Sequence, residues 1–184
     1  HKGMRFAAPV RKALATSTIF NILGPLTNPA HVNYELLGCY DVNLLETLAK
    51  ALKLTGVQRG MVINGNGMDE ISIFGSTKVS ELLADGSIKN YELTNKDFGI
   101  TGNYTQNDLL GGTPEENAAT ARLILSGKGN DAHNAVISAN VSAMLHLAGK
   151  TESFKDGFEI AMDAVKSGHG IEKLDAISKI TSEA

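Results

Sequence analysis

Several features that mark common protein classes are scarce in this sequence of 184 residues. Cys39 is the only cysteine, so a scaffold held by internal disulfides is excluded. No apolar run reaches the roughly 18 residues of a membrane-spanning helix. The formal net charge is only −3, which disfavours binding to nucleic acid or to an anionic membrane by bulk electrostatics. Because a lone cysteine suits a reducing compartment, we expect a cytoplasmic protein.

Local motifs of the commonest enzyme classes are also missing. The sequence has no G-x-S-x-G nucleophile elbow and no Walker phosphate loop. Its five histidines lack the three- or four-residue spacing of a local zinc site. The dinucleotide fingerprint fails because Gly65 and Gly67 lead to Asp69 and Glu70, and not to a third glycine and a helix. The common hydrolases and dehydrogenases are thereby excluded.

The residues that are present favour one compact domain or slightly more. Apolar residues make up 42% of the chain and charged residues 20%, which is enough for a packed core. A strand over 34–40, a helix over 41–56 and a strand over 60–63 follow one another as a βαβ unit. Before them, the sequence predicts a helix over 4–14 that is bent or restarted at Pro9, and an apolar run over 19–23 that Gly24-Pro25 stops.

The second half of the chain changes from strands to helices. Short apolar segments over 71–74, 79–83 and 88–93 read as strands, and Asp85-Gly86 joins the last two as a hairpin. Thr113 begins a helix as N-cap, with Pro114 and a capping-box glutamate behind it. Helices are expected over about 113–127, 131–148, 153–167 and 171–181. We therefore predict a mixed α/β fold with a mostly parallel central sheet flanked by helices in three layers.

Two groups of residues could carry chemistry. Asp69 and Glu70 lie on a glycine-rich loop after a predicted strand, at the sheet edge where α/β proteins bind ligands, and such a pair can hold a hard cation against a phosphate. A solvated acidic turn is the alternative. Arg11 ends the first helix and can grip a carboxylate with two hydrogen bonds, or simply complement the helix dipole. The residues alone leave both questions open.

Four segments stand out when taken together in chain order: Ala8–Lys12, Thr18–Pro29, Met68–Ser72 and Gly111–Asn117. They resemble the C-terminal half of the anthranilate phosphoribosyltransferase family of tryptophan biosynthesis. The likeness runs over nearly the whole chain, and its twelve-residue second segment is highly specific.

The resemblance implies Mg²⁺-dependent transfer of phosphoribosyl from phosphoribosyl pyrophosphate to anthranilate. By position, Asp69 and Glu70 match the acidic pair that holds Mg²⁺, and Arg11 and Gly24 match residues of the anthranilate site. It also implies a small helical domain, of which residues 1–30 would be a helical segment and hinge, and an α/β catalytic domain over 31–184. A homodimer of the complete protein, with neither nucleic acid nor membrane as partner, is expected.

The sequence also departs from the family. The family often has histidine where Asn64 stands, and differs at Met4. Its glycine-rich donor loop is not found in this chain, so we expect the chain by itself to be inactive. Three alternatives stay open: a pyrimidine-nucleoside phosphorylase of the same fold class, a non-catalytic paralogue that binds nucleic acid, and a folding or interaction fragment without a function of its own.

Overall fold

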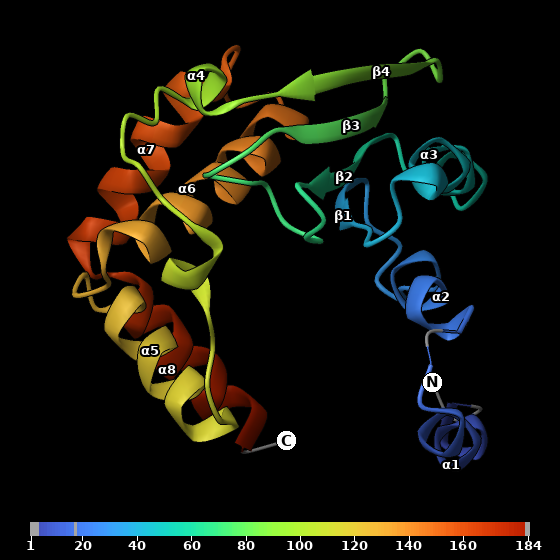
Figure 1. The fold of residues 1–184 in the computed structure, drawn as a ribbon, viewed down its shortest axis with the longest axis horizontal. Coiled ribbons are helices and arrows are strands. Elements are labelled where there is room, and N and C mark those ends of the chain that lie inside the picture. The colour runs from blue at the N-terminus through green and yellow to red at the C-terminus, as the bar shows by residue number, and fades with distance from the viewer. Residues whose placement is uncertain (1–3, 17, 183–184) are drawn as a thin grey trace.

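The computed structural model describes residues 4–16 and 18–182, and a four-stranded sheet in the order β1-β2-β3-β4 lies at its centre (Figure 1). β1 and β2 are parallel, whereas β3 runs antiparallel to both β2 and β4. The strands are β1 (Tyr34–Gly38), β2 (Arg59–Gly65), β3 (Thr77–Leu82) and β4 (Ile88–Leu93).

The mixed α/β class is confirmed, but the expectation of a mostly parallel sheet was wrong for the strands that the structure describes. Only the β1–β2 pair has a crossover helix between its strands, and parallel pairing needs such a crossover. The chain returns from β2 to β3 through the loop over 66–76, and the predicted hairpin at Asp85-Gly86 reverses it again into β4. Both of these pairings are therefore antiparallel.

The crossover after β1 forms as predicted. The Asp41 carboxylate accepts a hydrogen bond from the Asn43 amide at 2.9 Å and opens a short 3-10 turn, η1 (Val42–Leu44), which continues into α3 (Leu45–Leu54). α3 covers one face of the sheet. Its buried side is apolar at helical spacing and packs with Val62 of β2 in one core cluster. The buried residues of α3 are Leu45, Leu48, Ala49 and Leu52.

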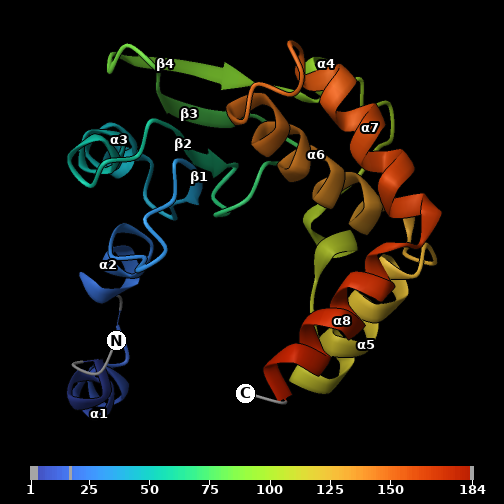
Figure 2. The ribbon, with the colours of Figure 1, turned by 180° about the vertical axis from the view of Figure 1, so that it is seen from behind.

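The opposite face of the sheet is covered by α6 (Asp131–Leu147), with α7 (Phe154–Ser167) packed against α6 (Figures 1 and 2). Met61 and Ile63 of β2 point to this side, so successive residues of β2 serve two different cores. α6 presents small residues to the sheet, which lets the two backbones approach closely; they are Ala132, Ala135, Ala139 and Ala143. The three-layer arrangement is thus confirmed.

The remaining helices extend away from the sheet. α5 (Pro114–Leu125) and α8 (Gly170–Ser182) lie side by side and project on the side of α6 and α7, while α1 (Met4–Leu14) and α2 (Phe20–Leu26) project on the side of α3 (Figures 1 and 2). The capping box at the start of α5 is present, with the Thr113 amide donating to Glu116 Oε2 at 2.7 Å. Two short turns, α4 (Asn95–Phe98) and η2 (Gln106–Leu109), join β4 to α5.

α1 runs as one helix through Pro9, so it does not restart there. Two other local expectations were wrong. α2 continues through Gly24 and Pro25. Pro25 has no amide hydrogen, so the helix loses one hydrogen bond there, but the Thr27 amide still donates to the Leu23 carbonyl at 3.0 Å and closes the turn. The segment 71–74 is buried but is no strand, because side chains take its amides: Ser72 donates to Thr77 Oγ1 at 2.9 Å.

A buried carboxylate lies at the amino end of β2. Glu81 of β3 is only 4% exposed, and its oxygens meet Arg59 Nη2 at 3.2 Å, His146 Nε2 at 3.4 Å and the Tyr91 hydroxyl at 2.9 Å. Burial raises the pKa of Glu81, but the hydrogen bonds from His146 and Tyr91 outweigh it, so the pKa lies below its ordinary value. Arg59 also donates to the His146 carbonyl at 3.2 Å and so ties α6 to the sheet.

Across the described ranges, no helix has the length and apolar character needed to cross a membrane.

Candidate functional site

The acidic pair lies on the loop that leaves β2, beside the carboxyl ends of the parallel strands β1 and β2. The loop begins with a tight turn in which Gly65 and Met68 exchange two backbone hydrogen bonds, at 2.9 and 3.1 Å. Asn66 and Gly67 between them have positive φ angles of 55° and 89°, the left-handed backbone that such a turn requires. Asp69 and Glu70 follow directly.

Two glycines let this loop lie flat on the strand ends. A Cβ atom on Gly38 of β1 would lie 2.7 Å from the carbonyl carbon of Asp69, and one on Gly65 would lie 2.5 Å from the amide nitrogen of Ser72. Both distances are shorter than any real Cβ contact, so neither position has room for a side chain. The two glycines therefore fix how closely the backbone of Asp69 and Glu70 approaches the sheet.

Asp69 and Glu70 carry negative charge that the described part of the chain leaves uncompensated. Both side chains are exposed, and neither forms a hydrogen bond or an ion pair with a described residue. Protein atoms around the Glu70 carboxyl group desolvate it and, together with the charge of Asp69, raise its pKa. A bound cation would relieve this repulsion.

The pair has the donor chemistry of a magnesium site that is shared with a ligand. No group of three or more metal-ligating side chains occurs among the residues the structure describes. Mg²⁺ keeps several waters and commonly takes only one or two carboxylates plus phosphate oxygens of a substrate. Two exposed carboxylates with no partner in the described chain fit that habit, whereas they would not make a closed structural metal site.

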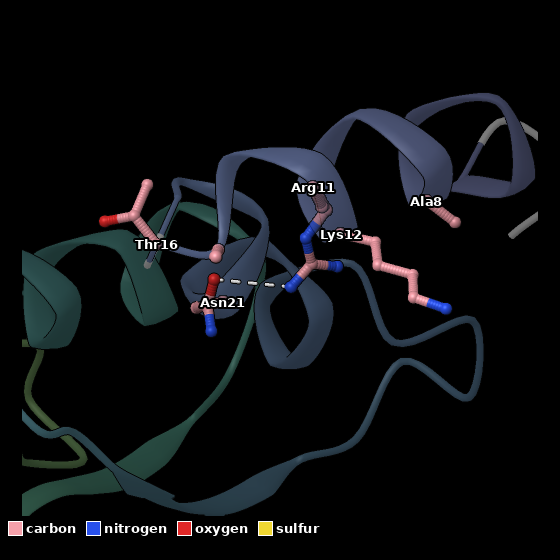
Figure 3. Close-up of a pocket in the computed structure, with 6 residues that line it drawn as sticks. Ala8, Arg11, Lys12, Thr16 and Asn21 are labelled. Atoms are coloured by element: carbon pink, nitrogen blue, oxygen red, sulfur yellow. Dashed lines mark hydrogen bonds between the residues drawn. The ribbon is translucent and has the colours of Figure 1, made fainter.

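Arg11 lies in the last turn of α1 and faces α2. Its Nη2 donates to Asn21 Oδ1 at 3.3 Å, and the Phe20 ring lies 5.8 Å from the guanidinium carbon. Asn21 Oδ1 also accepts the Thr18 amide at 3.0 Å, so the start of α2 holds the acceptor in place. Figure 3 shows Arg11 directed toward Asn21, while Lys12 extends away from it.

An open hollow of about 520 Å³ adjoins this guanidinium. Apart from the hydrogen bond to Asn21, Arg11 makes no polar contact within the described ranges, so donors remain for a ligand. A planar carboxylate could take two of them. The lining residues are Ala8, Arg11, Lys12, Ala15, Thr16 and Asn21 (Figure 3).

Gly24 lies apart from this hollow. It is exposed on α2, and nothing lies within 4 Å of the position that a Cβ atom would occupy. Gly24 does not line the hollow beside Arg11. Gly24 thus borders open space on α2, where a ligand could lie against it, but no other described residue contacts that space.

The structure does not bring the predicted site residues together. α2 lies between α1 and the sheet (Figures 1 and 2), so Arg11 is on one side of α2 and the acidic loop is at the end of β2. No hydrogen bond or ion pair within the described ranges joins Arg11 to Asp69 or Glu70. The candidate site therefore consists of two separate parts: the acidic pair at the end of β2, and Arg11 on α1.

Two asparagines that sequence reasoning did not assign support these parts. Asn21 holds Arg11, and buried Asn64 bonds to the turn before the acidic pair. Asn64 was noted only as a departure from the family. The available signal was its polarity at the end of an otherwise apolar buried strand, since buried polar groups need partners.

A family model and several known proteins match this chain. A family model described as "Glycosyl transferase family, a/b domain" matches residues 1–171. The anthranilate phosphoribosyltransferase of Tolumonas auensis is 44% identical over 181 residues, or 98% of this chain and 53% of that protein. The one of Psychromonas ingrahamii is 46% identical over 179 residues, or 97% of this chain and 52% of that protein.

Solved structures give the same result. The crystal structure of anthranilate phosphoribosyltransferase from Thermus thermophilus superposes with a TM-score of 0.85 at 37% identity, over 96% of this chain and 51% of that one. A variant of the Saccharomyces cerevisiae enzyme with Mg bound gives a TM-score of 0.83 at 31% identity, over 95% of this chain and 51% of that one.

The chain spans about half the length of the curated relatives it matches. The comparisons give no support to a pyrimidine-nucleoside phosphorylase or to a nucleic-acid-binding paralogue, and they confirm the resemblance found in the four sequence segments. The chain therefore belongs to the glycosyl transferase family that is defined by this a/b domain.

Proposed function

We propose that the complete protein containing this chain transfers the phosphoribosyl group of phosphoribosyl pyrophosphate to the amine of anthranilate and releases pyrophosphate. The observation that carries the proposal is the uncompensated Asp69–Glu70 pair at the carboxyl ends of β1 and β2. Ligands of α/β sheets bind at that edge, and a pyrophosphate needs counter-charge there. The named relatives, at 44% and 46% identity, support the choice of reaction.

Asp69 and Glu70 would hold Mg²⁺ in this proposal. The ion would neutralise the charge that develops on the leaving pyrophosphate and fix its orientation. The Saccharomyces cerevisiae variant was solved with Mg bound, which supports the same metal here. The two carboxylates contribute the negative charge that retains the ion, and the glycines beneath them set the height of the loop above the strands.

Arg11 and Gly24 would bind the acceptor. The guanidinium would pair with the carboxylate of anthranilate through two hydrogen bonds, while Asn21 keeps the guanidinium in place. Orientation makes the attack of a weakly nucleophilic aryl amine effectively intramolecular. The amine nitrogen forms its bond to ribose C1 as the bond from C1 to the pyrophosphate oxygen breaks, and the amine then loses one proton.

The remaining expectations stay part of this proposal. The proposal includes a helical segment over 1–30 and a catalytic domain over 31–184; Ile22 and Leu26 of α2 pack against the core cluster beside α3. Because the family's glycine-rich donor loop is not found in this chain, we expect the chain by itself to be inactive. A homodimer and a cytoplasmic location, with Cys39 as a free thiol, complete the proposal.

A magnesium titration of the complete protein tests the function. With anthranilate and phosphoribosyl pyrophosphate, the protein should form phosphoribosylanthranilate, and Asp69→Asn should raise the Mg²⁺ concentration for half-maximal rate by at least about tenfold, because one carboxylate ligand loses its charge. Asp163→Asn, an exposed aspartate on α7, is the matched control and should behave as the wild type. Turnover that is equal with and without Mg²⁺ would refute the metal role.

A further inference from the structure

Asn64 joins three pieces of backbone at the edge of the sheet. It ends the apolar part of β2 and is 7% exposed. Its Nδ2 donates to the carbonyl of Cys39 at 2.8 Å and to that of Tyr40 at 3.2 Å, just after β1. Its Oδ1 accepts the Gly67 amide at 3.1 Å, inside the turn that precedes the acidic pair. Every polar group of the side chain is therefore used.

These bonds act on the conformation of the turn. Asn66 and Gly67 have φ angles of 55° and 89°, and asparagine followed by glycine is the pair that such a tight turn prefers. The bond from the Gly67 amide to Asn64 closes the turn from the side of β2. The two bonds to Cys39 and Tyr40 fix the Asn64 amide group against β1. Through Asn64, the turn is therefore held in place relative to both β1 and β2.

We infer that Asn64 is a positioning residue for the acidic loop, and that it sets the affinity of the Asp69–Glu70 pair for a divalent cation. The inference rests on the proposed function, because it assigns Asn64 to the metal part of that site. Asn64 itself lies under the turn and contacts no ligand. It acts by keeping the loop in the one conformation in which both carboxylates extend from the end of β2.

The chemistry of the site favours asparagine over its substitutes. A neutral imidazole has one donor and one acceptor, so histidine can replace at most two of the three bonds. An aspartate keeps an acceptor but turns a second oxygen toward two carbonyl oxygens, which repels them. Only an amide of this length supplies two donors on one side and an acceptor on the other.

Loss of Asn64 should weaken cation binding without a matching effect on the acceptor site. Without the bond to Gly67 the turn occupies other conformations, and the measured affinity falls by the fraction of molecules that keep the competent one. One hydrogen bond changes such an equilibrium by about tenfold. The hollow beside Arg11 lies on α1 and α2, shares no residue with this turn, and should keep its affinity for anthranilate.

The test measures Mn²⁺ binding to the complete protein by electron paramagnetic resonance, with inorganic pyrophosphate present, alongside steady-state kinetics. The variants are Asn64→Ala and Asn64→Ser, the second being a smaller polar replacement in case the first does not fold. Asn134→Ala is the matched control, since Asn134 is also buried, at 5% exposure, and donates to a backbone carbonyl, that of Gly129 at 3.2 Å.

We expect both Asn64 variants to raise the Mn²⁺ dissociation constant about tenfold and to leave the KM for anthranilate within about twofold, whereas Asn134→Ala changes neither. Hydrogen exchange over residues 64–70 should speed up in the Asn64 variants. Wild-type Mn²⁺ affinity in both variants would overturn the inference, and so would equal losses for Mn²⁺ and anthranilate. The proposed function fails separately if wild-type Mn²⁺ binding does not depend on Asp69.

Discussion

Replacing Gly38 by alanine should displace the acidic loop. The new Cβ would lie 2.7 Å from the carbonyl carbon and 2.9 Å from the Cβ of Asp69, below the 3.0 Å that real Cβ atoms keep. Carbon atoms prefer about 3.5–4.0 Å, so the Asp69 backbone must retreat by roughly 1 Å. Because the clash is with backbone and not with a flexible side chain, we expect overpacking to cost about 1–3 kcal/mol.

Thermal unfolding of this chain measures the cost. A chain of this size loses about 2–4 °C in Tm for each kcal/mol, so Gly38→Ala should lower the Tm by about 2–12 °C. In the complete protein, the same variant should need more Mg²⁺ for half-maximal rate, because the retreat moves Asp69. Gly24→Ala is the matched control for stability: its Cβ meets nothing within 4 Å, and alanine in a helix should raise stability by about 0.5–1 kcal/mol. A Gly38→Ala protein with unchanged Tm and unchanged magnesium response would refute the geometry.

Two further predictions concern Glu81 and Arg11. Glu81→Gln should lower the free energy of unfolding at neutral pH by about 3 kcal/mol, because it leaves Arg59 without its buried partner. The folded-state pKa of Glu81 lies below its ordinary value, so wild-type stability should fall as the pH drops below about 4.3. The glutamine variant should lack this part of the acid dependence, and an identical urea midpoint for both proteins from pH 7 to pH 3 would contradict the network. In the complete protein, Arg11→Lys should raise the KM for anthranilate about tenfold, since an ammonium cannot form two parallel bonds to a carboxylate; an equal rise in the KM for phosphoribosyl pyrophosphate would argue against the assignment.

Local signals in the sequence predicted local structure well. The caps at Asp41 and Thr113 and the hairpin at Asp85-Gly86 depend on residues within a few positions of each other, and all three are present. The direction of β3 was missed because it depends on what the loop after β2 does over many residues. Residues 71–74 look like a strand by composition, yet Thr77 and Asn140 supply partners that no local pattern reveals.

The candidate site was predictable to the same degree. Asp69 and Glu70 lie at the strand edge where the βαβ pattern puts them, because parallel strands present their carboxyl ends together. The separation of Arg11 from that edge was not predictable, since it depends on how α1 and α2 are placed in space. Asn64 was also missed as a functional residue, because its partners Cys39 and Tyr40 lie just after a different strand, β1.

The two ends of β2 treat negative charge in opposite ways. Near Arg59, at the start of β2, the buried carboxylate of Glu81 on β3 accepts hydrogen bonds from Arg59 and Tyr91. Beyond Gly65, at the other end, the carboxylates of Asp69 and Glu70 are exposed and have no partner among the described residues. Stability and ligand binding thus depend on opposite ends of β2, about six residues apart at roughly 3.3 Å each. Substitutions that strengthen the contacts of Glu81 could therefore raise stability to heat or acid without changing the loop that carries Asp69 and Glu70.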